Sequence, residues 1–300
     1  MYHITIRPST FKLTPELKNQ NPFIDIKEIV NSKRAQEQHK QITTVVQPTL
    51  VYDIKKRGNI PDIVFTANMG LSCPRLPVPV VIVSHMKYRQ RRNERPYIKE
   101  ILEDRHINLV EFPDEAVFEG AAEAKWFDNG QLLVMGYGHR STEKSVKVLK
   151  TLLKTIYEGY GVEPPRVIAY ELQNPLFYHL DLAMVEIGQL ECIVQKEAFT
   201  AADIKALKAE LRVHIIESSD YFCLNSIIQG DTLLTHVLTD PTVKSKLETL
   251  TGKEVIEFDT SEFEKSGGSV RCLVFDVYDP RMIKKKGSQT NLSSPKSPKL

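Results

Sequence analysis

The residues of this sequence best suited to chemistry are a thiol, an imidazole and several carboxylates that lie within apolar runs. Cys272 follows a Gly-Gly-Ser turn and begins the run CLVFDVY. This placement predicts a thiol at the mouth of a strand, where nearby cationic groups would favour the thiolate. His179 could act as a general acid and base, and Asp181, two residues later, would face the same side of an extended segment.

Two further carboxylates lie in the Gly/Ala-rich stretch VFEGAAEAKWF (117–127). This composition allows close backbone approach, and Glu119 and Glu123 could hold a cationic group such as a guanidinium through charge-assisted hydrogen bonds. Burying such groups is costly unless they are paired, so each is either a satisfied core residue or part of a site. Taken together, they predict nucleophilic chemistry on a cationic substrate.

The other three cysteines have weaker claims. Cys192 and Cys223 lie in strand-like apolar runs and are expected in the core, whereas Cys73 is the second candidate nucleophile. The four cysteines show neither CxxC spacing nor a cluster with histidine, which predicts free thiols without disulfides, zinc or another metal site. Asn225, in FCLNSII, is interpreted as a strand residue without an assignable role.

Short apolar runs alternate with helical patterns along the chain, which predicts an α/β or α+β class. Val146, Leu149, Leu153 and Ile156 have helical spacing, and Thr200 with Asp203 resembles a capped helix start. The sequence contains no glycine-rich phosphate loop. The expected strands are 78–85, 107–112, 131–136, 166–170, 213–217, 231–238, 254–258 and 272–278.

The composition, with 41% hydrophobic and 26% charged residues over 300 positions, predicts one folded domain over residues 1–280. Residues 281–300 hold six basic residues and no acid, and we expect a disordered Ser/Pro-rich tail, either simply solvated or carrying modification sites or an address signal. The whole-chain charge of +2 thus corresponds to −4 for residues 1–280, which argues against a nucleic-acid partner. The absence of a signal pattern or membrane span predicts a cytoplasmic protein.

Five ordered motifs, FTAN with Gly70, FEGAAE, GYGHRS, FYHLD and GGSVRC, resemble those of the guanidine-modifying superfamily. That superfamily includes arginine deiminases, dimethylarginine dimethylaminohydrolases and amidinotransferases. The motifs are most similar to those of cyanobacterial-type arginine dihydrolases, which read FTANAG, FEGAGD, GYGFRS, FYHLD and GGAAKC. The resemblance covers about residues 1–280. It implies a pentein-type α/β propeller of five ββαβ units about a pseudo-fivefold axis, in a single domain.

The resemblance also implies a mechanism that needs no cofactor. Cys272 would attack the guanidinium carbon, and loss of ammonia would leave a covalent thiouronium on the enzyme. His179 would protonate the departing amine and then activate water. Glu119 and Asp181 would hold the guanidinium nitrogens.

One position points to a subfamily. Arginine deiminases carry an aspartate at the position of Asn68. The dihydrolases carry an asparagine there, as this chain does. An amide both donates and accepts, so it could retain a ureido product for a second round, which would convert arginine to ornithine, carbon dioxide and two ammonia. The resemblance places Asn21 beside the guanidine, and Arg91 and Arg140 on the α-carboxylate.

Several positions depart from the pattern or have a simpler interpretation. Glu123 is assigned to the substrate site although an aspartate is usual there, and Ser269-Val270 replace Ala-Ala before Cys272. Arg91 lies among other arginines, so its segment could instead be a solvated loop. His139, Trp126 and Tyr137 are interpreted as neighbouring or packing residues.

Three functions stay open. The first is a cysteine hydrolase of free arginine, and the second acts on methylated arginine, agmatine or another guanidine, or transfers the amidino group. The third is a catalytically silent binding or regulatory relative, against which the intact set of Cys272, His179, Glu119 and Asp181 argues. The expected partner is a small guanidine, and a homo-oligomer is possible.

Overall fold

Five small sheets, each of three strands, form the framework of the protein. The computed structural model describes residues 1–54 and 58–284. Within these residues each sheet combines one antiparallel and one parallel strand pair. In four sheets a hairpin is followed by a helix and a parallel third strand, because parallel strands need a long crossover. The remaining sheet joins the two ends of the described chain, since β15 pairs antiparallel with β1 and β2 pairs parallel with β1.

The central strand of each sheet is largely buried. For example, all four residues of β4 and all five of β1 are buried, as expected of strands covered on both faces. The central strands are β1 (Tyr2–Ile6), β4 (Val80–Val83), β7 (Leu132–Tyr137), β10 (Glu191–Gln195) and β13 (Thr232–His236). Their antiparallel partners are β15 (Phe275–Val277), β3 (Gly70–Ser72), β6 (Ala124–Phe127), β9 (Met184–Gly188) and β12 (Ile227–Gln229). Their parallel partners are β2 (Thr49–Tyr52), β5 (Asn108–Glu111), β8 (Arg166–Glu171), β11 (Arg212–Ile216) and β14 (Glu254–Phe258).

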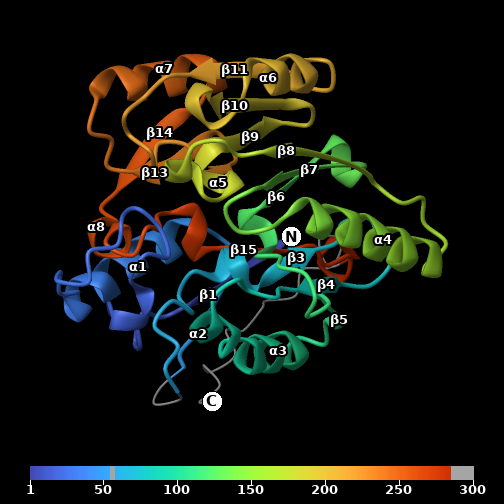
Figure 1. The fold of residues 1–300 in the computed structure, drawn as a ribbon, viewed down its shortest axis with the longest axis horizontal. Helices are drawn as coiled ribbons and strands as arrows, with labels where there is room; N and C mark the ends of the chain where they lie inside the picture. The colour runs from blue at the N-terminus through green and yellow to red at the C-terminus, as the bar shows by residue number, and fades with distance from the viewer. Residues whose placement is uncertain (55–57, 285–300) are drawn as a thin grey trace.

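Five crossover helices lie at the periphery of the molecule (Figure 1). They are α1 (Ser32–Val45), α3 (Arg95–Asp104), α4 (Glu143–Gly159), α6 (Ala201–Lys208) and α7 (Pro241–Thr251). The shorter helices are α2 (Arg89–Arg92), α5 (Leu180–Ala183), α8 (Ser261–Glu264) and α9 (Arg281–Lys284). Single 3-10 turns are η1 (Pro15–Leu17), η2 (Thr66–Met69), η3 (Gly120–Ala122), η4 (Asp128–Gly130), η5 (Pro175–Phe177), η6 (Lys196–Ala198) and η7 (Arg271–Leu273).

The apolar core is divided into five clusters, each containing one crossover helix. Four clusters join two neighbouring sheets; in one of them, Leu149 and Leu153 of α4 pack with Ile82 of β4 and Leu133 of β7. The fifth joins the sheet of β12–β14 to α1 and to the segment that leads into β15. The crossover helices therefore fill the spaces between adjacent sheets and hold the loops at the strand ends in fixed positions.

The predicted α/β class is confirmed, as are the buried face of α4 and the Thr200–Asp203 capping box of α6. The apolar runs that carry reactive residues differ from expectation. The segment 62–71 contains η2 (Thr66–Met69), and the segment 177–184 contains α5 (Leu180–Ala183). Cys272 lies in η7, so that β15 begins only at Phe275. Hydropathy cannot separate a short buried turn from a buried strand.

The boundary of the expected tail also needs correction. Arg281–Lys284 form α9, and the Arg281 guanidinium pairs with Asp279 at 2.8 Å, so the folded chain extends past residue 280. The rest of the expected tail, residues 285–300, lies outside the described residues. Within the described chain, no helix is long and apolar enough to cross a membrane.

Candidate active site

A small cavity brings together most of the residues singled out in the sequence. Its volume is about 20 Å³, which is room for about one water molecule. The walls come from loops that follow or precede strands of different sheets, so residues far apart in sequence meet there. The lining residues are Gln20, Asn21, Asp62, Phe65, Asn68, Arg91, Arg140, Tyr178, His179, Ser266, Gly268 and Cys272.

The thiol of Cys272 faces a carboxylate. Its Sγ lies 3.5 Å from Asp181 Oδ2, and both residues are buried. Burial, reinforced by the negative charge of Asp181, raises the pKa of the Cys272 thiol far above its ordinary value. Arg271, the chain neighbour of Cys272, pairs with Asp276 at 2.7 Å, so its charge already has a partner. The surroundings of Cys272 thus favour the neutral thiol over the thiolate.

Asp181 is a carboxylate with unused hydrogen-bonding capacity. Its side chain is fully buried in the first turn of α5, and burial raises its pKa. Oδ2 faces the thiol, whereas Oδ1 has no hydrogen-bond partner in the described structure. A buried acceptor without a donor is costly, so this oxygen favours a ligand that brings N–H groups.

The imidazole of His179 shares a carboxylate oxygen with an arginine. His179 Nε2 lies 2.7 Å from Glu119 Oε2, and Arg140 Nη1 donates to the same oxygen at 2.9 Å. Although burial opposes ionisation, the Arg140 guanidinium and the His179 hydrogen bond hold the pKa of Glu119 well below its usual range. Glu119 is therefore a fixed negative charge that orients the imidazole.

Arg140 is held between two aromatic rings. Its guanidinium carbon lies 4.9 Å from the ring centre of Tyr88 and 4.7 Å from that of Tyr178. Its Nη2 donates to the Gln20 carbonyl at 3.0 Å. Arg140 thus lines the cavity, but both terminal nitrogens of its guanidinium already donate hydrogen bonds, to Glu119 and to Gln20. Its pairing with a substrate carboxylate stays a prediction.

Glu123 lies behind the cavity wall. Its Oε2 accepts the backbone N–H of Glu119 at 2.8 Å, and its Oε1 accepts that of Ser141 at 2.9 Å. The Ser141 hydroxyl also donates to this carboxylate. Glu123 therefore fixes the loops that carry Glu119 and Arg140, and it is not among the cavity-lining residues.

Asn68 and Arg91 form a connected pair in the wall. Arg91 Nη1 donates to Asn68 Oδ1 at 3.0 Å, and Asn68 Nδ2 donates to the Glu119 carbonyl at 3.3 Å. Arg91 also makes a bidentate pair with Glu94, with both bonds at 2.9 Å. The interpretation as a solvated loop is wrong for Arg91, which is buried. Its charge already has an internal partner, so its assignment to a substrate carboxylate stays a prediction.

Glycines allow the loops around the cavity to approach closely. Gly267 has φ +83°, and a Cβ there would meet Asn21 side-chain atoms at 2.6 Å. Asn21 in turn donates to the Ser266 carbonyl at 3.0 Å, which fastens the N-terminal loop to the Gly-Gly-Ser turn. Gly120 has φ +67°, and a Cβ would lie 2.5 Å from the Gly70 carbonyl oxygen. These contacts bring the FEG segment against Gly70, which follows FTAN, and bring the GGS turn against the N-terminal loop.

Two residues important to this geometry were missed in the sequence. Asn225 lies in a turn before β12 and donates from Nδ2 to Cys272 Sγ at 3.2 Å. Asp62 lines the cavity, and its Oδ1 accepts the Ser266 hydroxyl at 3.0 Å. Burial raises the pKa of Asp62. A polar residue within an apolar run is the one signal that the sequence offered for either.

The alternative nucleophile and the neighbouring residues lie elsewhere. Cys73 is buried in the core cluster around α4, and burial raises its pKa to about 12. Cys192 is buried in β10 as expected, whereas Cys223 is buried in the turn before β12. His139, Trp126 and Tyr137 do not line the cavity.

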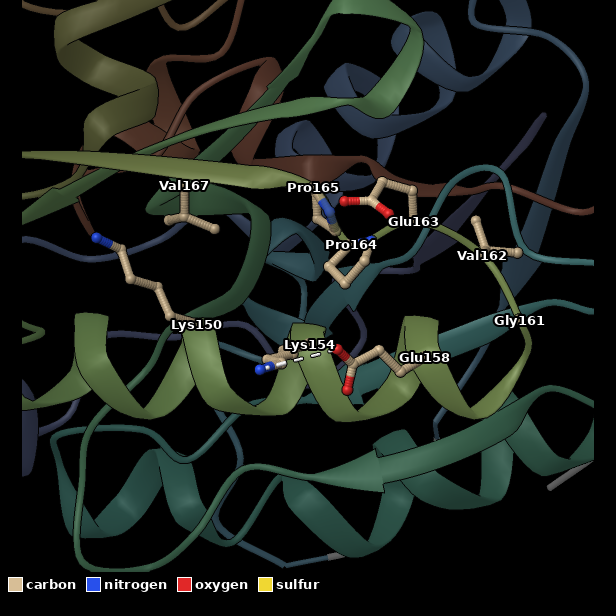
Figure 2. A pocket seen from close by; sticks show the side chains of 9 residues that line it. All are labelled: Lys150, Lys154, Glu158, Gly161, Val162, Glu163, Pro164, Pro165 and Val167. Atoms are coloured by element: carbon tan, nitrogen blue, oxygen red, sulfur yellow. Dashed lines mark ion pairs between the residues drawn. The ribbon is translucent and has the colours of Figure 1, made fainter.

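A larger hollow lies between α4 and the segment leading into β8 (Figure 2). Its volume is about 650 Å³, but it is an open surface groove whose lining includes no thiol, imidazole or hydroxyl. Its one ion pair among the described residues joins Lys154 to Glu158 at 3.8 Å on the surface of α4. The smaller cavity is the candidate active site because the reactive groups lie there. Across residues 1–54 and 58–284, no three His, Cys, Asp or Glu side chains form a metal-binding group.

Known proteins are similar to this chain in sequence and in fold. The family model described as N,N dimethylarginine dimethylhydrolase, eukaryotic, matches residues 7–279. The bifunctional arginine dihydrolase/ornithine cyclodeaminase ArgZ of Synechocystis is 30% identical over 83% of this chain and 34% of its own length. The dimethylarginine dimethylaminohydrolase of Mycobacterium tuberculosis is 26% identical over 86% of this chain and 80% of its own. The chain thus spans about a third of the length of ArgZ.

Solved structures agree with these matches. The N-terminal domain of ArgZ, covalently bound to a reaction intermediate, matches with a TM-score of 0.77 and 26% identity, over 91% of this chain and 96% of that domain. A dimethylarginine dimethylaminohydrolase adduct shares the fold, with a TM-score of 0.68 and 19% identity over 92% of this chain and 99% of its own. The chain belongs to the dimethylarginine dimethylaminohydrolase family of the guanidine-modifying superfamily.

Proposed function

We propose that this protein is an arginine dihydrolase that converts arginine and two waters to ornithine, carbon dioxide and two ammonia. The observation that carries the proposal is the buried Asp181 carboxylate, with one oxygen 3.5 Å from the Cys272 thiol and the other without a partner. A guanidinium would complete this arrangement in two ways. Its N–H groups supply a donor for the unpartnered oxygen of Asp181, and its positive charge favours the thiolate of Cys272. Its carbon then lies next to the sulfur.

The first round begins when a guanidinium binds and Cys272 loses its proton. The sulfur attacks the guanidinium carbon, and the C–N bond to one terminal nitrogen breaks as His179 transfers a proton to the leaving ammonia. Water, deprotonated by His179, then adds to the thiouronium carbon, and the C–S bond breaks to give citrulline. Glu119 supports both proton transfers because its fixed charge stabilises the imidazolium.

The second round acts on the citrulline that the site retains. The thiolate attacks the ureido carbon, ammonia leaves, and a thiocarbamate remains on Cys272. Addition of a second water releases a carbamate, which separates into carbon dioxide and ornithine. We assign the retention to Asn68, whose amide can donate to the ureido oxygen and accept from an N–H, whereas a carboxylate could only accept.

The same assignment gives the α-substituents of the substrate their partners. We assign the carboxylate to Arg91 and Arg140 and place Asn21 beside the guanidine. The buried Asp62 carboxylate supplies a counter-charge for the α-amine. Because the cavity volume is about 20 Å³, substrate binding must displace present contacts, such as that of Arg140 with the Gln20 carbonyl.

We also propose that the five sheets close into a ring about a pseudo-fivefold axis, as a single catalytic domain. Its support is the series of core clusters. Four of them link two neighbouring sheets through a crossover helix, and the fifth joins the sheet of β12–β14 to α1 and to the segment that leads into β15. The ring would direct the loops that carry Asn68, Glu119, His179 and Cys272 toward its centre.

A second candidate is the hydrolysis of dimethylarginine to citrulline and dimethylamine. It is favoured by the family model, which matches residues 7–279. Product analysis by mass spectrometry with arginine labelled with ¹³C at the guanidine carbon separates the two. Labelled carbon dioxide with ornithine supports the dihydrolase, and labelled citrulline alone indicates a single round. Unchanged arginine together with dimethylamine release from dimethylarginine would refute the first candidate in favour of the second.

A further inference from the structure

A side chain from the segment that precedes β12 contacts Cys272, the proposed nucleophile. Asn225 precedes β12, and its amide is completely buried. Its Nδ2 donates to Cys272 Sγ at 3.2 Å and to the Asp181 carbonyl at 3.4 Å. Its Oδ1 accepts the backbone N–H of Arg271 at 2.9 Å and that of Cys272 at 3.3 Å. One amide therefore contacts the nucleophile on both its side chain and its backbone.

We propose that Asn225 is a positioning residue for the reaction, which fixes η7 and stabilises the thiolate form of Cys272. This inference rests on the proposed role of Cys272 as the nucleophile. The resting thiol points toward Asp181 Oδ2 at 3.5 Å, a contact that opposes ionisation. The Asn225 amide favours ionisation of the thiol, because an N–H donor stabilises a thiolate more than a neutral thiol.

The residue type is specific to this task. Asparagine offers a donor and an acceptor from one planar group, so it can hold two backbone N–H groups and the sulfur together. Aspartate has the same shape but would place a second carboxylate beside a thiol that already faces Asp181. Alanine would remove all four hydrogen bonds.

The molecule contains a matched control. Gln195 Nε2 donates to the sulfur of Cys223 at 3.2 Å, in a buried site that does not line the cavity. Removal of this amide takes away the same kind of bond from a cysteine without a proposed catalytic role. A general loss of stability would therefore affect Gln195→Ala and Asn225→Ala alike.

The experiment measures the rate at which iodoacetamide alkylates Cys272 as a function of pH, by peptide mapping of the native chain, Asn225→Ala, Asn225→Asp and Gln195→Ala. Ionisable groups besides Cys272 itself face this site and are common to all four proteins: Asp62, Arg91, Glu119, Arg140, Tyr178, His179, Asp181 and Arg271. We expect the midpoint of the Cys272 profile to rise by about one pH unit or more in Asn225→Ala and further in Asn225→Asp. It should not move in Gln195→Ala.

Steady-state kinetics provide the second readout. We expect kcat to fall roughly 100-fold in Asn225→Ala and further in Asn225→Asp, with KM within about threefold of the native value. If the Cys272 profile of Asn225→Ala coincides with that of the native chain, or if Gln195→Ala shifts it equally, the proposal is overturned. Alkylation is read without substrate, so an incorrect substrate assignment appears separately, as native protein that leaves arginine unchanged.

Discussion

Two buried histidines in this protein make nearly the same first contact but have different surroundings. His179 lies 2.7 Å from Glu119, and His236 lies 2.7 Å from Asp220. His236 has a second carboxylate, Glu264, 3.2 Å from its Nδ1. By contrast, Nδ1 of His179 makes no hydrogen bond within residues 1–54 and 58–284, and His179 lines the cavity beside Cys272.

The second contact decides what each histidine can do. Although burial opposes it, the carboxylates of Asp220 and Glu264 raise the pKa of His236 to about 9, so this ring stays charged at neutral pH. Glu119 is shared between His179 and Arg140, which balances its charge without engaging the second ring nitrogen. A buried histidine between two carboxylates is therefore a structural cation, whereas one with a free nitrogen beside a thiol can exchange protons.

We expect the largest effect on turnover from replacement of Cys272, the proposed nucleophile, and a much smaller effect from replacement of a core cysteine. Cys272→Ala should reduce turnover of a guanidine substrate by at least about 10⁴-fold, since no other group can form the covalent intermediate. Cys73→Ser should leave most of the activity, because Cys73 lies in the core cluster around α4. Steady-state assays of the two variants check this prediction, and the reverse pattern would move the nucleophile to Cys73.

Replacement of each histidine tests the comparison directly. His179→Asn should lower kcat by about 10³-fold because the general acid and base is lost. His236→Asn should leave kcat within about tenfold but lower the urea midpoint, since Asp220 and Glu264 lose their shared cation. Equal losses of activity in the two variants, at equal folded fractions, would contradict the assignment.

Replacement of the two glutamates of the FEGAAE motif should lower kcat by different but smaller factors. Glu119→Gln removes the fixed charge between His179 and Arg140 and should lower kcat by about 100-fold. In Glu123→Gln, the amide oxygen can still accept a backbone N–H, so kcat should fall by less than about tenfold. A larger loss in Glu123→Gln than in Glu119→Gln would assign direct substrate contact to Glu123.

The smallest expected effect is a pH dependence of stability. The pKa of His236 is raised in the folded state from 6.5 to about 9, so its contribution is full below pH 6.5 and is lost as the pH rises through 9. The shift corresponds to on the order of 3 kcal/mol. Urea unfolding should show that the free energy of unfolding of the native chain falls between pH 6.5 and pH 9.5. The fall should be smaller in His236→Asn. An equal loss in both would remove His236 from this role.

Some features could be predicted from the sequence and others could not, for physical reasons. The apolar periodicity of α4 and the alternation of short strands with helices predict the α/β class, because these patterns reflect burial. The motifs predict several cavity-lining residues, such as Asn68, His179 and Cys272, whereas Glu123 lies behind the wall. The turn at Cys272, the partner of Arg91 and the role of Asn225 depend on contacts between distant segments. Asn225 and Cys272, for example, are 47 positions apart. Local pattern carries no information about such contacts.

We propose above that Cys272 forms a covalent bond to the guanidine carbon of the substrate. The direct test is acid quenching of the protein during turnover of arginine labelled with ¹³C at the guanidine carbon, followed by mass spectrometry of its peptides. We expect the labelled carbon on the peptide that contains Cys272, and no adduct in Cys272→Ala. Turnover with the label on the Cys73 peptide, or with no labelled peptide at any quench time, would contradict this account.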